Sequence, residues 1–190
     1  MKTLTYPVAK TAVSELRVGD TVRLSGLVFT GRDRFHRYLA DGGPCPVNLR
    51  DGSLFHCGPI VLRQGSEWIV KAAGPTTSIR QEPYMAGIIR RHGLRVIIGK
   101  GGMGDATRRA CAETGCIYVH LVGGAAALAA GYVTKVQGVH FLREFGAAEA
   151  VWEFIVRDLE GVVAIDACGS SLHDDIARKS STALSRLLSA

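Results

Sequence analysis

The sequence predicts a mixed α/β fold, and three observations carry that prediction. Segments of strand-like and helix-like composition alternate between residues 68 and 130, which is typical of parallel strand pairing. Strand-like segments are denser in residues 1–73 than in residues 74–190. The chain has 190 residues, of which 47% are apolar, so it can bury a sizeable core. We therefore expect one domain over residues 1–190, with a β-richer part (1–73) and an α/β part (74–190).

Strands are expected where β-branched and apolar residues run together between turn signals. Residues 21–29 alternate partly between apolar and polar side chains after the turn Gly19-Asp20, and residues 96–99 (Val-Ile-Ile-Gly) form a short apolar run. The same criteria predict further strands at 54–62, 68–73, 117–122, 133–142, 152–157 and 161–166.

Helices are expected after several of these strands, where capping residues precede a helical pattern. The helix over residues 30–40 has Thr30 as its expected N-cap and Asp33 three positions later. A second helix runs from about Thr76 to His92 and is broken or restarted near Pro83. Further helices are predicted at 105–114, ended by Gly115, at 125–130, and at 170–190.

The bulk composition limits the class of protein. The net charge of +6 permits a nucleic acid, an acidic partner or an anionic substrate, but no run of five or six basic residues occurs. The five cysteines are odd in number, and Cys111 and Cys116 have no second pair at metal-binding spacing. The first residues lack the apolar region of a signal peptide, and no apolar run could span a membrane. We therefore expect a cytoplasmic protein that ligates no metal by itself.

The most informative residues lie in two glycine-rich segments, 74–80 (Gly-Pro-Thr-Thr-Ser-Ile-Arg) and 100–103 (Lys-Gly-Gly-Met). Hydroxyls and backbone N–H groups at a helix start can hold one anionic group, and arginine can bind a carboxylate through two parallel hydrogen bonds. Lysine adds a compact positive charge. Neither segment contains a carboxylate, a cysteine or a histidine. They therefore predict a site that binds a small acid and forms only part of a catalytic centre.

Four polar or glycine-rich turns occur where a predicted strand ends: Thr30-Gly31-Arg32, Thr76-Thr77, Lys100-Gly101-Gly102 and Gly123-Gly124. In open α/β sheets, ligands bind at the carboxyl ends of strands, so these turns could converge on one crevice. Glycine at a strand–helix turn can also serve backbone geometry alone, and this alternative stays open for Gly123-Gly124.

Arg32 and His36 lie one helical turn apart. Arg32 could bind a substrate carboxylate and His36 could tune it, or the pair could belong to an ordinary capped helix with a solvated arginine. The other histidines stand singly and are expected to be structural or exposed (His56, His92, His120, His140 and His173).

An alternative function is RNA binding. Ile98-Gly99-Lys100-Gly101-Gly102 reads like the loop of a KH domain, in which a GXXG sequence clamps the nucleic-acid backbone. A KH loop joins two helices, whereas this string follows a predicted strand. The string also lacks the Gly-Lys-Ser/Thr ending of a P-loop. We therefore keep a KH-like module as the alternative to an enzyme and expect no nucleic acid as partner.

Taken in order, the motifs resemble the β subunit, or C-terminal domain, of class I iron–sulfur hydro-lyases, which include fumarate hydratase and L(+)-tartrate dehydratase. The resemblance covers residues 20–168 and rests on these strings: Leu24-Ser25-Gly26, Thr30-Gly31-Arg32-Asp33, Cys57-Gly58-Pro59, Gly74-Pro75-Thr76-Thr77-Ser78 with Arg80, Ile98-Gly99-Lys100-Gly101, Gly123-Gly124-Ala125-Ala126-Ala127 and Ala148-Glu149-Ala150-Val151-Trp152-Glu153-Phe154.

The resemblance implies roles for five residues. Arg32, Arg80 and Lys100 would bind carboxylate or hydroxyl oxygens of the substrate, and Thr77 would shape the pocket. Thr76 would lie close enough to take part in proton transfer, as the base proposed in the family. Thr76 and Lys100 are thus the expected catalytic residues, and all five are expected to line the substrate site.

The resemblance also implies a fold, a cofactor and a partner. The fold would be a mixed three-layer β/β/α "swivelling" domain. A [4Fe-4S] cluster would be carried by a separate α subunit, and this chain would supply no ligand to it. The chain would act in a hetero-oligomer such as α2β2, or form a homodimer when alone. Fumarate/malate is the first expected substrate and tartrate/oxaloacetate the second.

Overall fold

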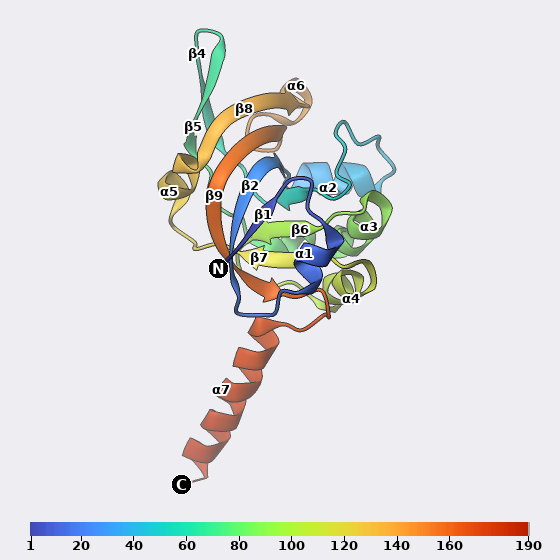
Figure 1. Ribbon diagram of the computed structural model, residues 1–190, viewed down its shortest axis with the longest axis vertical. Coiled ribbons are helices and arrows are strands. Elements are labelled where there is room, and N and C mark those ends of the chain that lie inside the picture. The colour runs from blue at the N-terminus through green and yellow to red at the C-terminus, as the bar shows by residue number, and fades with distance from the viewer. Residues whose placement is uncertain (190) are drawn as a thin grey trace.

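The structure is a computed structural model, and it describes residues 1–189. Its main sheet contains β1 (Lys2–Thr5), β2 (Thr21–Thr30), β3 (Ser53–Phe55), β6 (Val96–Gly99), β7 (Ile117–His120), β8 (Val133–His140) and β9 (Val151–Ile165). The strand order is β1-β2-β3-β6-β7-β9-β8 (Figure 1). β2 pairs with β9 as well as with β3, so β2, β3, β6, β7 and β9 close into a small barrel. The mixed α/β class is confirmed, whereas the three-layer swivelling arrangement stays a prediction.

Strand direction divides the sheet. β1, β2, β3, β6 and β7 run parallel to one another, and β9 runs antiparallel to β2, β7 and β8. The parallel pairing expected between residues 68 and 130 is therefore found for β6 and β7. Strands from residues 1–73 and from residues 74–190 share this one sheet, so the β-richer part is not a separate layer.

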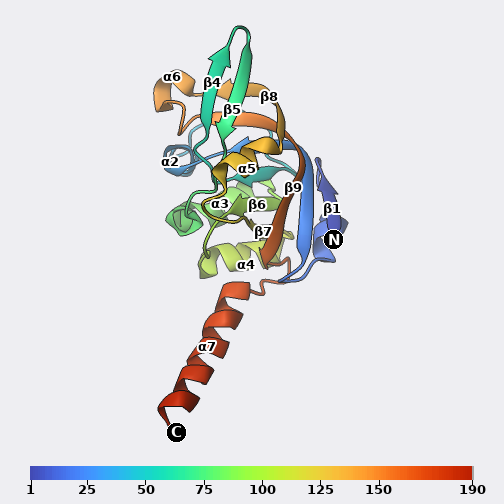
Figure 2. The same ribbon diagram turned by 90° about the vertical axis from the view of Figure 1, so that its left-hand side faces the viewer.

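The predicted strand over residues 54–62 is wrong as a single element. β3 ends at Phe55, and the chain leaves the sheet through Cys57-Gly58-Pro59. Proline cannot donate to a strand ladder, and here it precedes β4 (Ile60–Gln64). β4 pairs only with β5 (Glu67–Ala72), and this hairpin projects from the body (Figures 1 and 2).

Helices α2 (Asp33–Ala40), α3 (Glu82–His92) and α4 (Asp105–Thr114) cover one side of the sheet (Figure 1). The predicted helix over residues 76–92 starts later than expected, as a 3₁₀ turn followed by α3, and Pro83 lies in the first turn of α3, where its missing N–H costs nothing. The helical elements are α1 (Lys10–Ser14), α2 (Asp33–Ala40), the 3₁₀ turn η1 (Ser78–Gln81), α3 (Glu82–His92), α4 (Asp105–Thr114), α5 (Ala126–Gly131), α6 (Leu142–Phe145) and α7 (Leu172–Leu188).

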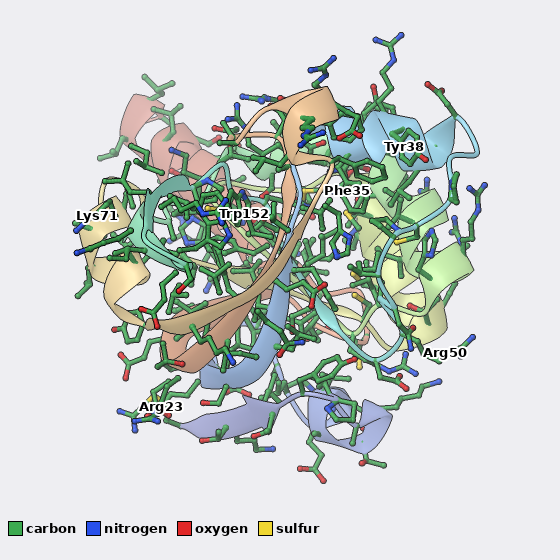
Figure 3. All side chains as sticks on the ribbon, turned by 90° about the horizontal axis from the view of Figure 1, so that it is seen from above. Arg23, Phe35, Tyr38, Arg50, Lys71 and Trp152 are labelled. Atoms are coloured by element: carbon green, nitrogen blue, oxygen red, sulfur yellow. The ribbon has the colours of Figure 1, made fainter. Side chains whose placement is uncertain are left out.

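Both faces of the central strands are buried. On β6, Ile97 packs into the cluster under the helices, whereas Ile98 points into the opposite cluster inside the barrel. This alternation places apolar residues on both faces of a pleated strand, which explains why β6 reads as one apolar run. Phe35 and Trp152 lie in the interior, and Arg23, Arg50 and Lys71 lie at the periphery (Figure 3).

Two further strand predictions need correction. The strands expected at 152–157 and 161–166 form one long β9, which passes through Asp158 with a positive φ of 54° and keeps its pairing with β2. β1 was not expected at all, because its four residues acquire strand structure by parallel pairing with β2. In both cases the partner strand decides the structure, and no local signal reports it.

Helix α7 leaves the body of the molecule as a single rod (Figures 1 and 2). The predicted helix over 170–190 is confirmed at Leu172–Leu188, while Ala190 lies outside the described residues. Ser171 caps the helix by accepting a hydrogen bond from Asp174 N–H at 3.2 Å. Within residues 1–189, no helix combines the length and apolar character needed to cross a membrane.

Candidate active site at the carboxyl edge of the sheet

The strand register brings four turns to one edge of the sheet. Thr30 in β2 pairs with Phe55 in β3, Phe55 pairs with Ile98 in β6, and Ile98 pairs with Val119 in β7. The segments that follow these residues therefore emerge side by side, as expected for the carboxyl ends of parallel strands.

A fifth segment threads between these strand ends. Thr76 N–H donates to the His56 carbonyl at 2.7 Å, and Lys100 N–H donates to the Thr76 carbonyl at 3.3 Å. Ser78 N–H returns a bond to the Lys100 carbonyl at 3.0 Å. This backbone ladder holds Thr76, Thr77 and Lys100 together, although they come from separate parts of the sequence.

Arg32 is the N-cap residue of α2, and its side chain passes across Gly58. A Cβ atom at Gly58 would lie within 2.7 Å of Arg32 side-chain atoms and of the Ala148 carbonyl oxygen, so only glycine fits there. Arg32 Nε lies 3.4 Å from Glu149 Oε1. The predicted N-cap role of Thr30 is wrong, because its hydroxyl is buried and bonded to β9, accepting from Trp152 N–H at 2.9 Å.

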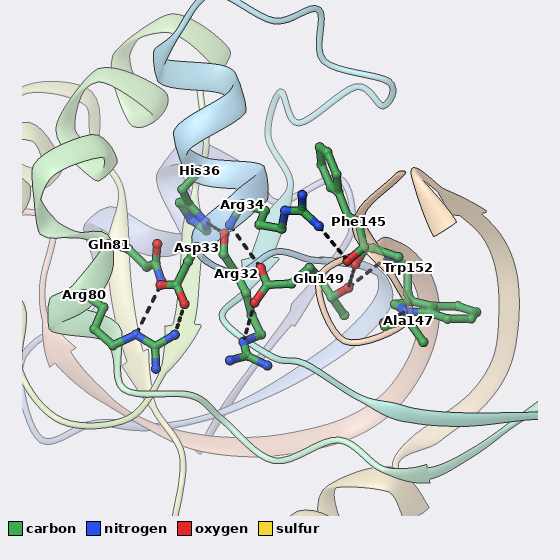
Figure 4. Close-up of polar contacts among 12 residues, drawn as sticks. Arg32, Asp33, Arg34, His36, Arg80, Gln81, Phe145, Ala147, Glu149 and Trp152 are labelled. Carbon is green, nitrogen blue, oxygen red and sulfur yellow. Dashed lines mark hydrogen bonds and ion pairs between the residues drawn. The ribbon is translucent and has the colours of Figure 1, made fainter. Parts of the chain in front are cut away.

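Arg80 lies in η1 and faces the first turn of α2 (Figure 4). Its guanidinium contacts the Asp33 carboxylate side-on, through Nη2 to Oδ2 and through Nε to Oδ1 at 3.2 Å. Gln81 Nε2 donates to the same Asp33 Oδ1 at 2.7 Å. The Asp33 carboxylate is therefore held from two sides, which fixes the plane of the Arg80 guanidinium.

Lys100 contributes the third cation. Within residues 1–189 its ammonium has no hydrogen-bond or ion-pair partner, and a Cβ at Gly123 would lie 3.5 Å from its Cδ. The loop that follows is held at both ends. Tyr118 hydroxyl donates to the Gly101 carbonyl at 2.9 Å, and the Glu82 carboxylate accepts from Gly104 N–H at 2.8 Å.

Two buried histidines lie beneath these residues. His36 Nδ1–H donates to the Arg32 carbonyl at 2.7 Å, and the His36 and His56 rings meet edge-to-face with centroids 4.9 Å apart. His56 Nδ1 lies 2.9 Å from Ser78 Oγ. Burial lowers the pKa of His36 to about 4, and burial together with the neighbouring His36 lowers the pKa of His56 well below its usual value. Both rings are thus neutral near pH 7.

His36 therefore acts on the backbone of Arg32, and its ring makes no hydrogen bond to the guanidinium. His56, which the sequence suggested as structural or exposed, is fully buried and supports the Thr76–Ser78 segment. The sequence also missed the carboxylates of Asp33 and Glu149. As a partner of an arginine, Asp33 was signalled only by its place next to Arg32 in the Thr-Gly-Arg-Asp string. Glu149 was signalled only by its place in a motif that carries the family resemblance.

The cysteines do not form a metal centre in the described part of the chain, where no three His, Cys, Asp or Glu side chains gather. Cys57, Cys111 and Cys116 are buried. Burial raises the pKa of the Cys57 thiol, which disfavours the thiolate that binds iron. The placement of an iron–sulfur cluster on a partner subunit stays a prediction.

The loop Ile98–Gly102 differs from a KH loop in its surroundings. It follows the buried strand β6 and is tied through Gly101 to Tyr118, and it precedes α4. A KH loop connects two helices, so the geometry gives the RNA-binding alternative no support.

Comparison with known proteins shows the family of this chain. The family model described as fumarase C-terminus matches residues 2–176, so the chain belongs to this family. It is a member of the class I fumarase and tartrate dehydratase β-subunit group, as its relatives indicate.

Three relatives illustrate the relationship. A protein of Geobacillus stearothermophilus named as a class I fumarate hydratase is 46% identical over 185 residues, which cover 97% of this chain and 36% of that protein. The L(+)-tartrate dehydratase subunit β of Escherichia coli K12 is 36% identical over 173 residues, covering 90% and 86%. A Methanocaldococcus jannaschii protein named as the same subunit is 34% identical over 184 residues, covering 94% of each chain. The chain thus spans about a third of the Geobacillus protein and most of the two subunits.

Proposed function

We propose that the chain is the β subunit of an iron–sulfur-dependent hydro-lyase that reversibly hydrates a C4 dicarboxylate. Fumarate/malate is the first substrate pair and tartrate/oxaloacetate the second. The observation that carries the proposal is the meeting of Arg32, Thr76 and Lys100 at one sheet edge, with Arg80 anchored to the same helix start. Three cationic residues at one sheet edge suit a substrate with two carboxylates.

Each residue has a role that follows from its chemistry. Arg32 and Arg80 bind carboxylate oxygens through their planar N–H groups, and Thr77 borders the pocket. Lys100 pairs through its backbone with Thr77 and so brings a positive charge to the segment that holds Thr76. In this proposal that charge lowers the free energy of an alkoxide-like state at the Thr76 hydroxyl. A threonine alone is a weak base in water, so Thr76 needs this cationic surrounding to accept a proton from the substrate carbon.

The rest of the site comes from a partner in this proposal. A [4Fe-4S] cluster carried by an α subunit supplies a Lewis acid that polarises the substrate hydroxyl. In the Geobacillus relative, 64% of the chain lies outside the matched part, and the two other relatives are named subunit β. An αβ assembly such as α2β2 reproduces with two chains what the longer relative holds in one. A homodimer of the isolated chain remains part of the proposal for the state without partner.

Exposed apolar side chains next to the site support such a partner. Ile79 adjoins Arg80, Val122 precedes Gly123, and Leu128 lies in α5, which abuts Gly74 through Ala126. Val122 is 73% and Leu128 65% exposed, which is unusual for large apolar residues beside a charged site. α5 and the β4–β5 hairpin lie in front in Figure 2 and mark this face.

Co-expression tests the proposal. The chain is produced with a candidate α subunit, the cluster is reconstituted anaerobically, and fumarate and tartrate turnover are assayed. Hydro-lyase activity that requires both chains is expected. Absence of activity with every cognate α subunit, together with salt-sensitive RNA binding that needs Gly99–Gly102, would instead favour the KH-like alternative.

A further inference from the structure

We propose that Asp33 and Glu149 are positioning residues, which hold Arg80 and Arg32 in the orientation needed to receive the two carboxylates of the substrate. The inference rests on the proposed function and extends it to two acidic residues. Neither residue carries a charge that suits a dianion, so their presence at a cationic site requires an explanation.

The Arg80–Asp33 contact leaves one side of the guanidinium available. Asp33 occupies the edge formed by Nε and Nη2, and Nη1 makes no hydrogen bond within residues 1–189. Figure 4 shows Nη1 pointing away from Asp33, on the side toward which the Arg32 guanidinium also extends. A substrate carboxylate can therefore approach Arg80 without displacing Asp33.

Glu149 forms a looser contact with Arg32, an ion pair without a hydrogen bond at Nε within residues 1–189. Its Oε1 lies 3.4 Å from Arg32 Nε, and its Oε2 accepts from Arg34 N–H at 3.0 Å. The Nη1 and Nη2 groups of Arg32 extend beyond this contact (Figure 4). Glu149 is thus fixed by the first turn of α2, places its charge against the Nε edge of Arg32 and leaves the terminal nitrogens for a ligand.

Both contacts meet at the start of one helix. Arg32 is the N-cap of α2, and Asp33 and Arg34 are its first two residues. Arg32 on α2 is held by Glu149, which precedes β9, whereas Arg80 in η1 is held by Asp33 on α2. The start of α2 therefore sets the positions of both guanidiniums relative to each other, which two mobile arginines could not achieve.

A purely stabilising role does not account for the Arg80–Asp33 contact. The Arg80 and Asp33 side chains are 44% and 41% exposed, and ion pairs with that exposure contribute little to folding stability. Gln81 nevertheless adds a hydrogen bond to Asp33 from a fully buried side chain. A buried side chain therefore orients the Asp33 carboxylate, although the ion pair that Asp33 forms has little effect on stability.

The test uses the reconstituted complex with its α subunit. Asp33→Asn keeps the size of the side chain and removes its charge. We expect KM for the dicarboxylate to rise about tenfold or more, with an unchanged thermal unfolding midpoint and unchanged subunit association. Glu149→Gln should have the same effect through Arg32 and serves as the second variant. Asp41→Asn is the matched control, because Asp41 is the C-cap residue of the same helix and its carboxylate pairs, within residues 1–189, only with exposed Arg37 at 4.0 Å.

Nitrogen NMR of the arginine side chains gives a readout that does not depend on turnover. The Arg80 Nη signals should be separate in the wild-type chain, because Asp33 restricts rotation, and should average in Asp33→Asn. An active wild type with unchanged or lowered KM in both variants would overturn the positioning role, and lowered KM would identify the carboxylates as competitors of the substrate. An inactive wild-type complex would overturn the proposed function instead, and averaged Arg80 signals in the wild type would overturn the positioning role by themselves.

Discussion

Two layers of side chains meet at the carboxyl edge of the sheet, and they differ in burial and in charge. The buried layer consists of His36, His56, Ser78 and Tyr118, which are neutral and hydrogen-bonded. The charged layer consists of Arg32, Arg80 and Lys100 and is partly exposed. Desolvation keeps the first layer uncharged, whereas solvent contact lets the second keep its charge. The comparison teaches that the layer which holds the backbone and the layer which binds a ligand are separate sets of residues.

The largest effect is expected when a charge is removed from the charged layer, which tests whether this layer binds the ligand. Lys100→Ala or Arg80→Ala should lower kcat/KM of the reconstituted complex by about 10- to 100-fold or more, because each charge-assisted contact contributes roughly 1.5–3 kcal/mol. The unfolding midpoint and subunit association should stay unchanged. Lys71→Ala on the exposed hairpin is the control (Figure 3). Wild-type kcat/KM in both variants would show that the site lies elsewhere.

A methyl group added against the buried layer should instead act mainly on the free energy of unfolding. A Cβ at Gly99 would overlap Ser78 Oγ and lie 3.3 Å from His56 Nδ1. Gly99→Ala should therefore lower the free energy of unfolding by about 1–3 kcal/mol in denaturant titrations.

The matched control for this change is Gly87→Ala in α3, where a Cβ meets no atom within 4 Å. Replacing a glycine inside a helix should raise the free energy of unfolding by about 0.5–1 kcal/mol. Equal effects of the two substitutions would contradict tight packing of Ser78 against β6.

The buried layer also predicts a pH dependence of stability, of about the same size as the effect of Gly99→Ala. His36 has a pKa of about 4 in the folded chain and 6.5 as its ordinary value, so the unfolded state binds more protons between these values. Lowering the pH from 7 to 5 should therefore reduce the free energy of unfolding by about 2 kcal/mol through His36. Denaturant titrations at both pH values should show a smaller decrease in His36→Gln. An identical decrease in that variant would exclude His36 as the source.

Local patterns predicted a large part of the fold. β6 and α4 have the predicted bounds, because an apolar run between turn signals and a helix ended by glycine are local features. The same logic failed where pairing decides the structure, as in β9 and in the segment 54–62. Thr30 shows the limit most clearly. Its residue type suits an N-cap, yet its hydroxyl bonds to Trp152, which lies 122 residues later.

The sequence also predicted only part of the candidate site. Thr76 and Lys100 could be selected from their own segments, because hydroxyls, glycines and a cation next to a strand end have a recognisable chemistry. The partners of the arginines could not be selected, because Asp33 and Arg80 lie 47 residues apart and Arg34 and Glu149 lie 115 residues apart. Sequence spacing contains no information about such contacts.

The amino-acid sequence by itself determined the class of the fold, the positions of most helices and central strands, and the chemistry of the groups at the strand ends. These features depend on periodicity, residue type and short-range turns. Only the tertiary structure decided that β2 and β9 close a barrel, that two neutral histidines lie under the charged residues, and that Asp33 and Glu149 hold the arginines. The physical reason is that side-chain orientation and desolvation arise from packing between segments that the sequence keeps far apart.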